Sequence, residues 1–89
     1  MARNMRDSPL NLAALPVGAR AHITHVDWDS IDATSARRLR ELGLDAGVDV
    51  EALHRGSLFA RDPMAVRVGR MRIILRLVHA AAFHLEPST

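Results

Sequence analysis

Apolar and polar residues alternate along several short stretches of this chain. In the first stretch, Ala19, Ala21 and Ile23 are each separated by one residue that is polar. Side chains two residues apart lie on the same face of a β-strand, so this period indicates a strand with one buried face. The same period recurs in three later sets: Val48, Val50 and Ala52; Met64, Val66 and Val68; and Met71, Ile73 and Leu75. The pattern therefore predicts a mainly β chain.

Turn residues separate these predicted strands. Pro16-Val17-Gly18 and Asp45-Ala46-Gly47 each precede a strand, and glycine there permits the positive φ of a tight turn. Leu53 breaks the alternation of the second strand, which predicts a β-bulge. Gly69-Arg70 lies between the third and fourth strands and predicts a short hairpin.

One amphipathic helix is predicted between the first two strands, over residues 33–42. Asp32 can cap its start by accepting a hydrogen bond from a backbone N–H of the first turn. Gly43 can end it in a left-handed conformation, with Leu44 contacting Leu39 in a Schellman motif. The apolar face of the helix is formed by Ala36, Leu39 and Leu42.

The segments outside these elements are patterned less clearly. Residues 10–15 are mostly apolar and are expected to pack against the strands. Residues 74–85 match both helical and extended templates. We expect one helical turn there, followed by a closing strand over residues 83–86 that stops at Pro87.

The number and length of these elements predict the fold class. A chain of 89 residues has room for one core and one domain, which we place at residues 10–87 between tails at 1–9 and 88–89, the first of them mobile. Five short strands, with one helix inserted after the first and a helical turn near the C-terminus, fit a small, partly open barrel. Curling the sheet removes edges that so short a chain could not otherwise cover.

Composition narrows the classes of function. Hydrophobic residues make up 48% of the chain and charged residues 25%, which is typical of a folded domain. The absence of cysteine excludes a disulfide framework and a thiolate metal site, and it fits a reducing cytoplasm. The sequence shows no signal-peptide pattern and no apolar run that could span a membrane. No P-loop, HExxH pair or nucleophile elbow is present, so we expect that the chain is not an enzyme.

The charge of the chain is small despite a calculated pI of 11.0. Twelve basic residues, all of them arginine, stand against ten acidic residues, which leaves a formal charge of +2. Aromatic residues make up only 3% of the chain, so no platform for stacking bases is expected. Nucleic-acid binding is therefore an alternative that a mobility-shift experiment would test, and we expect no nucleic acid as a partner.

Histidines are the candidate metal ligands, because neutral imidazole binds transition metals well. The candidates are His22, His25 and His54, while His79 and His84 are dispersed. A regular strand would point His22 and His25 to opposite faces, so chelation requires a bulge or convergence across strands. No cofactor is required on this interpretation, and weak Fe²⁺ or Zn²⁺ binding, or adventitious binding, remains open.

A partner-binding surface is predicted in the groove between the inserted helix and the barrel, and in the loop that follows residue 54. Leu58 and Phe59 are large apolar residues flanked by arginines, which suits an interface, although they could instead close the barrel end as core. The helix carries basic residues that could meet an acidic partner or could simply be solvated. The predicted contact residues are Leu39, Leu42, Leu58, Phe59, Arg37, Arg38, Arg55 and Arg61.

Five motifs in this order resemble the FeoA family. They are Leu15-Pro16-Val17-Gly18, Arg38-Leu39-Arg40-Glu41-Leu42-Gly43-Leu44, Gly47-Val48-Asp49-Val50, Asp62-Pro63-Met64-Ala65-Val66-Arg67-Val68-Gly69 and Ile73-Ile74-Leu75-Arg76. The chain departs from many relatives at Ala46, where they have proline. The same domain type resembles the C-terminal SH3-like domain of DtxR-type metalloregulators, but a helix-turn-helix half has no room here.

The resemblance implies an SH3-like barrel and a cytoplasmic, non-enzymatic partner of FeoB. FeoB is the membrane transporter of ferrous iron that carries a G-protein domain, and the family role is to bind and modulate it. A transition-metal chaperone or sensor is the alternative function. A peripheral membrane helix over residues 71–85 is disfavoured by its strand-like start. Small barrels with open edges often dimerise, so a homodimer is a further alternative.

Overall fold

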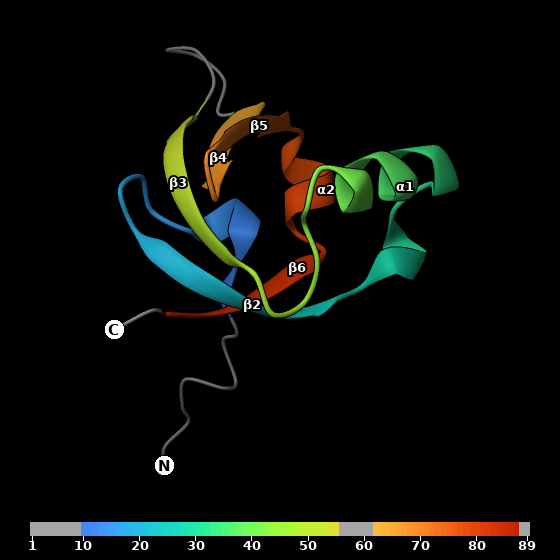
Figure 1. Ribbon diagram of the computed structural model, residues 1–89, viewed down its shortest axis with the longest axis horizontal. Coiled ribbons are helices and arrows are strands. Elements are labelled where there is room, and N and C mark those ends of the chain that lie inside the picture. The colour runs from blue at the N-terminus through green and yellow to red at the C-terminus, as the bar shows by residue number, and fades with distance from the viewer. Residues whose placement is uncertain (1–9, 56–61, 88–89) are drawn as a thin grey trace.

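The computed structural model describes residues 10–55 and 62–87, which form one antiparallel sheet with two α-helices (Figure 1). The strands follow the order β1-β6-β2-β3-β4-β5 across the sheet. Their bounds are β1 Leu10–Asn11, β2 Arg20–Val26, β3 Asp49–Arg55, β4 Met64–Val68, β5 Met71–Leu75 and β6 Phe83–Pro87. The helices are α1 Ala33–Glu41 and α2 Leu77–Ala80, and 3₁₀ turns form at η2 Leu12–Ala14 and η3 Trp28–Ser30.

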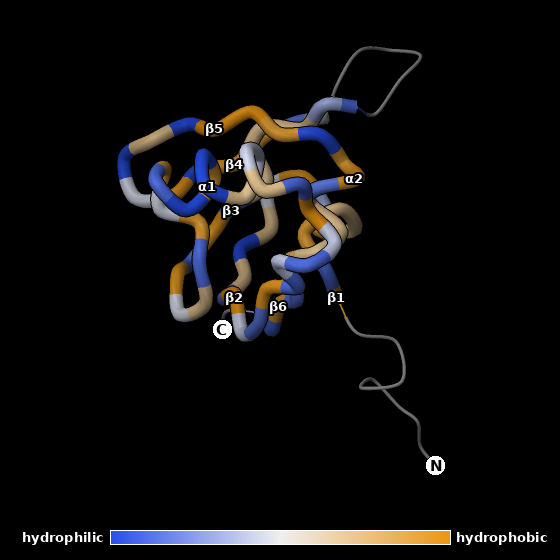
Figure 2. Tube along the Cα trace, turned by 90° about the vertical axis from the view of Figure 1, so that its right-hand side faces the viewer, coloured by the Kyte–Doolittle hydropathy of each residue, from blue (hydrophilic) through white to orange (hydrophobic). Residues whose placement is uncertain are grey.

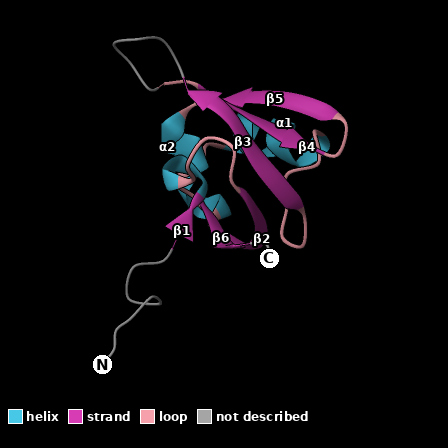
Figure 3. Ribbon diagram, turned by 90° about the vertical axis from the view of Figure 1, so that its left-hand side faces the viewer, coloured by secondary structure: helices cyan, strands magenta, loops and turns pink. Residues whose placement is uncertain are grey.

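The sheet curls around an apolar core, and β1 and β5 are its two ends (Figure 3). Among the described residues no polar or charged side chain is buried. The largest fully buried side chains are Phe83, Leu12, Leu15, Ile23, Leu44, Met64 and Val66. The prediction of a mainly β barrel with one inserted helix is therefore confirmed.

The described residues form six strands, where five were predicted. The additional strand is β1, which pairs with β6 through Leu10 opposite Leu85 and Asn11 opposite His84. Two residues are too few to show an alternating pattern, so the sequence gives this segment no strand signal. The predicted packing of residues 10–15 is confirmed, because Leu12 and Leu15 are buried in the core.

Two β-bulges shape the sheet. The pairing of β3 with β4 shifts between Ala52 and His54, which confirms the bulge predicted at Leu53. A second shift separates Ile23 from His25 in the pairing of β2 with β6. Because of this shift Thr24 and His25 are both exposed, although they are consecutive residues of one strand.

Helix α1 has the predicted start and end. The Asp32 carboxylate accepts a hydrogen bond from the Ser35 N–H at 3.0 Å. Gly43 has a φ of +104°, and the Leu44 N–H donates to the Leu39 carbonyl at 3.0 Å, which is a Schellman motif. Leu39 and Leu44 are both buried, so the end of the helix is fixed against the core.

The C-terminal part of the chain also follows the prediction. Val68 pairs with Met71 across the Gly69-Arg70 turn, and α2 is one helical turn that leads into β6. The N–H of Leu77 donates to the Asp62 carboxylate at 2.8 Å, so a residue from the approach to β4 caps α2. None of the helices in the described residues is long and apolar enough to cross a membrane.

Candidate docking surface around α1

Helix α1 lies beside the barrel (Figure 1). Its side chains line a groove on each of two sides. The first, here called the α1–β5 groove, has a volume of about 470 Å³ and lies between α1, α2 and the end of β5. The second, here called the Trp28 groove, has a volume of about 440 Å³ and lies between η3 and α1. Helix α1 is therefore a ridge with a hollow on either side.

Basic and apolar side chains line the α1–β5 groove. Leu39 and Leu75 are buried and contribute its apolar wall, while Ile74 is 45% exposed. Arg38 and Arg76 are both exposed at its edge. Arg38 has no ion-pair partner within residues 10–55 and 62–87, so its charge is available to a ligand.

Asp32 joins the two helices at this groove. One carboxylate oxygen caps α1 through Ser35, and the other lies 3.5 Å from Nε2 of His79 on α2. The hydrogen bond from the Ser35 backbone is the main reason that the pKa of Asp32 lies below its ordinary value, and the nearby His79 lowers it further. Asp32 is therefore ionised at neutral pH, and its carboxylate caps the start of α1.

Trp28 is the central side chain of the second groove. Its ring meets Phe83 edge to face, with the ring centroids 5.6 Å apart. The Arg40 guanidinium carbon lies 4.5 Å from the centroid of the Trp28 ring, which is a cation–π contact. Arg37 lines the same groove. A half-buried tryptophan beside two arginines is a combination that protein interfaces favour.

The predicted partner-binding residues are distributed unevenly over this surface. Arg37 and Arg38 line different grooves, and Leu42 is half-buried against the core. Leu39 is only 2% exposed, so it supports the α1–β5 groove from below. Figure 2 shows the hydrophilic character of much of α1. Leu58, Phe59 and Arg61 lie outside the described residues, and of Arg55 only the backbone, at the end of β3, is described.

Trp28 was not among the residues predicted from the sequence. Its sequence neighbours Asp27, Asp29 and Ser30 are polar, so the segment shows no apolar pattern that would mark Trp28. Its position depends on Phe83, which lies far away in the sequence and brings no local signal. A lone tryptophan just before a capped helix was the available clue.

The three predicted metal ligands do not converge. His22 Nδ1 lies 2.9 Å from the Asp49 carboxylate, and His54 Nε2 lies 2.6 Å from the guanidinium of Arg72. His25 instead stacks on His84. Within residues 10–55 and 62–87, no group of three or more His, Cys, Asp or Glu side chains could hold a metal ion.

Comparison with known proteins identifies the family to which this chain belongs. The model of the FeoA domain matches residues 10–87. The FeoA protein from Chlorobium tepidum has a TM-score of 0.77 and 28% identity, covering 90% of this chain and 71% of that chain. FeoA from Stenotrophomonas maltophilia, solved with zinc and described as a prokaryotic SH3 domain protein, has a TM-score of 0.69 and 32% identity, covering 86% and 89%.

The fold also occurs outside these transport proteins. A manganese-dependent transcriptional repressor has a TM-score of 0.74 at 16% identity, covering 90% of this chain and 43% of that chain, which shows a shared fold alone. A comparison with curated protein sequences found no significant match. The match to the family model over residues 10–87 and the likeness to the S. maltophilia protein together show that this chain is a member of the FeoA family, whose proteins are linked to ferrous iron transport.

Proposed function

We propose that this chain is a non-enzymatic, cytoplasmic accessory protein that binds a FeoB-type ferrous iron transporter and modulates its activity. Family membership links the chain to ferrous iron transport. The S. maltophilia relative is described as a possible activating factor of bacterial ferrous iron transport. On this proposal the protein meets the inner face of the membrane only through the transporter.

The surface around α1 is the docking site in this proposal. The single observation that carries it is the cluster of Trp28, Arg37 and Arg40 on an open groove. Tryptophan and arginine are the residues most enriched among those that dominate binding energy, and desolvating them in a groove strengthens their contacts. The partner should therefore present acidic groups around an apolar side chain that fits beside Trp28.

The α1–β5 groove extends this surface on the other side of the helix. Arg38 and Arg76 lie at its edge and Ile74 exposes apolar area within it. A partner segment that crossed α1 would meet basic groups in both grooves. The proposal keeps the predicted residues Arg37, Arg38, Leu39 and Leu42 as contact or support residues, together with the predicted Arg55, Leu58, Phe59 and Arg61 of the loop.

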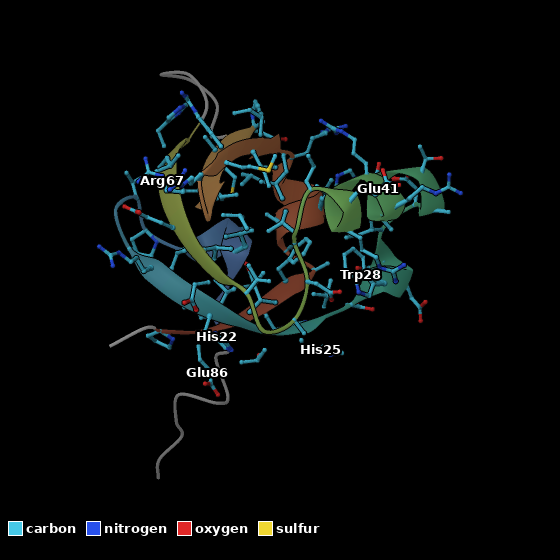
Figure 4. The ribbon with its side chains drawn as sticks, in the orientation of Figure 1. His22, His25, Trp28, Glu41, Arg67 and Glu86 are labelled. Carbon is cyan, nitrogen blue, oxygen red and sulfur yellow. The ribbon has the colours of Figure 1, made fainter. Side chains whose placement is uncertain are left out.

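A binding experiment with the intact transporter in nanodiscs tests this proposal. The double variant Arg37→Ala/Arg40→Ala removes two positive charges from the Trp28 groove. Its matched control, Arg20→Ala/Arg67→Ala, removes two positive charges from strands of the barrel, and Figure 4 shows Arg67 on the side of the molecule opposite Trp28. We expect the first variant to weaken binding by about tenfold or more and the control to change it little.

Two results would contradict the proposal. If the unaltered protein neither binds the transporter nor changes its rate of nucleotide hydrolysis, the assigned function is wrong. If both double variants weaken binding equally, the partner senses total charge and the docking surface is wrong. Circular dichroism of each variant checks that the fold is intact.

A transition-metal chaperone or sensor is the second candidate function. It is supported by the zinc in the S. maltophilia relative and by the fold shared with a manganese-dependent repressor. On our proposal the protein needs no metal to fold, since its core is entirely apolar within the described residues. Ferrous iron titration of His22→Ala and His54→Ala tests the ligands predicted from the sequence.

A further inference from the structure

Five histidines are present, and their surroundings divide them into two groups. His22, His54 and His79 each lie against one charged side chain: Asp49, Arg72 and Asp32, respectively. The imidazole rings of His25 and His84 have no hydrogen-bond or ion-pair partner within residues 10–55 and 62–87. These two rings stack on each other, with centroids 5.5 Å apart and planes at 28°.

The sheet holds His25 and His84 in this position. They are direct cross-strand partners of the antiparallel pair β2 and β6. The bulge between Ile23 and His25 turns His25 outward, and the hydroxyl of Thr24 donates to the His84 carbonyl at 3.2 Å. Both side chains are thus carried by paired strands, which would reduce the entropy lost if they bound a common ligand.

The surroundings of the pair suit a cation. His25 is exposed and His84 is half-buried, so solvent can reach the space beside both rings. Glu86 lies two residues after His84 on β6, directly opposite His22. Figure 4 shows His22, His25 and Glu86 on the same side of the molecule. A carboxylate near the pair lowers the cost of bringing in a positive ion, whereas His54 lies against the cationic Arg72.

We propose that the rings of His25 and His84 turn out of their stacked arrangement and together bind one divalent transition-metal ion, with water completing the coordination. Two neutral imidazoles suit Zn²⁺, Cu²⁺ and Ni²⁺, and nitrogen sites bind Fe²⁺ more weakly than Ni²⁺ or Cu²⁺. The pair therefore selects against the ferrous ion that the family is linked to. This site is independent of the proposed docking to the transporter, because it lies on the β2–β6 face and not at α1.

Zinc titration of the protein without a polyhistidine tag tests the proposal. Isothermal calorimetry should give one Zn²⁺ per chain, and NMR of the histidine ring nitrogens should show shifts for His25 and His84 on zinc addition. Losing a group that hydrogen-bonds to a metal ligand commonly lowers metal affinity about 10–100-fold. Losing a ligand itself should cost at least as much, so His25→Gln and His84→Gln should each weaken Zn²⁺ binding by roughly tenfold or more. The matched controls His22→Gln and His54→Gln should leave it unchanged.

Three outcomes separate this site from the alternatives. Loss of Zn²⁺ binding in His22→Gln but not in His84→Gln would overturn the proposal and place the ion at His22 and Asp49. Binding that none of the four variants changes would show an adventitious ion only. Tighter binding of Fe²⁺ than of Ni²⁺, measured without oxygen, would contradict a two-imidazole site. Unchanged melting temperatures without metal confirm that the glutamine variants fold.

Discussion

Replacing Asp32 by alanine removes the hydrogen bond that begins α1. The Asp32 carboxylate accepts from the Ser35 N–H at 3.0 Å, and its loss leaves that N–H without a cap. Removing such a cap costs about 0.5–2 kcal/mol of unfolding free energy. The contact to His79 adds little, because Asp32 is well exposed and water screens the pair. We therefore expect a loss of about 1 kcal/mol.

Thermal and urea unfolding measure this loss. For a domain of this size about 1 kcal/mol lowers the melting temperature by roughly 4–8 °C. Asp32→Asn is the matched control, since asparagine caps helices about as well as aspartate does. An equal loss in Asp32→Ala and Asp32→Asn would refute the capping argument and point to the charge. No loss in Asp32→Ala would show that the core alone fixes the start of α1.

The same residue makes stability depend on pH. Folding lowers the pKa of Asp32 below its ordinary value of 3.8, chiefly through the Ser35 hydrogen bond. An acid with a lowered pKa stabilises the fold above the unfolded-state value, and the stabilisation is lost as pH falls through the folded-state pKa. The difference between the parent and Asp32→Ala should therefore be constant near neutrality and shrink below pH 3.8. Urea titrations at several acidic pH values check this dependence.

Three further substitutions have definite expected outcomes. Gly43→Ala should lower the free energy of unfolding, measured with urea, by about 1–2 kcal/mol, because the backbone at residue 43 has a φ of +104°, which alanine rarely adopts. A steric clash does not contribute, since the added Cβ would lie at an ordinary 3.8 Å from Val68. Phe83→Ala should cost about 3–5 kcal/mol, because Phe83 is fully buried, and near-ultraviolet circular dichroism should show altered packing of Trp28. Arg38→Ala should make the affinity for the transporter less sensitive to salt between about 0.05 and about 0.5 M, because one exposed positive charge that salt screens is removed.

The sequence predicted the elements whose signals are local. Asp32, Gly43 and Leu44 specify the two ends of α1 within a few residues of chain, and all three contacts are present. The break at Leu53 marked the bulge of β3 because alternation fails at that residue itself. The ends of α1 and the bulge of β3 are determined by residues close to them in the sequence, so the local pattern predicts them.

The parts that were missed depend on strand register. His84 lies opposite His25 only because β2 is shifted by one residue at its bulge, and no local pattern marks that shift. Trp28 contacts Phe83, a residue that is distant in the sequence. Pairing between distant segments is set by the packing of the whole barrel, so one sequence without its three-dimensional structure does not reveal it.

The pairing of β1 with β6 has a practical consequence for experiments on this protein. The first and last strands are neighbours, and Figure 3 shows both at the end of the molecule opposite α1. A fluorophore, surface anchor or fusion partner attached beyond either strand would leave both flanks of the helix accessible. Immobilised at either terminus, the molecule would present its helix to a membrane protein in solution.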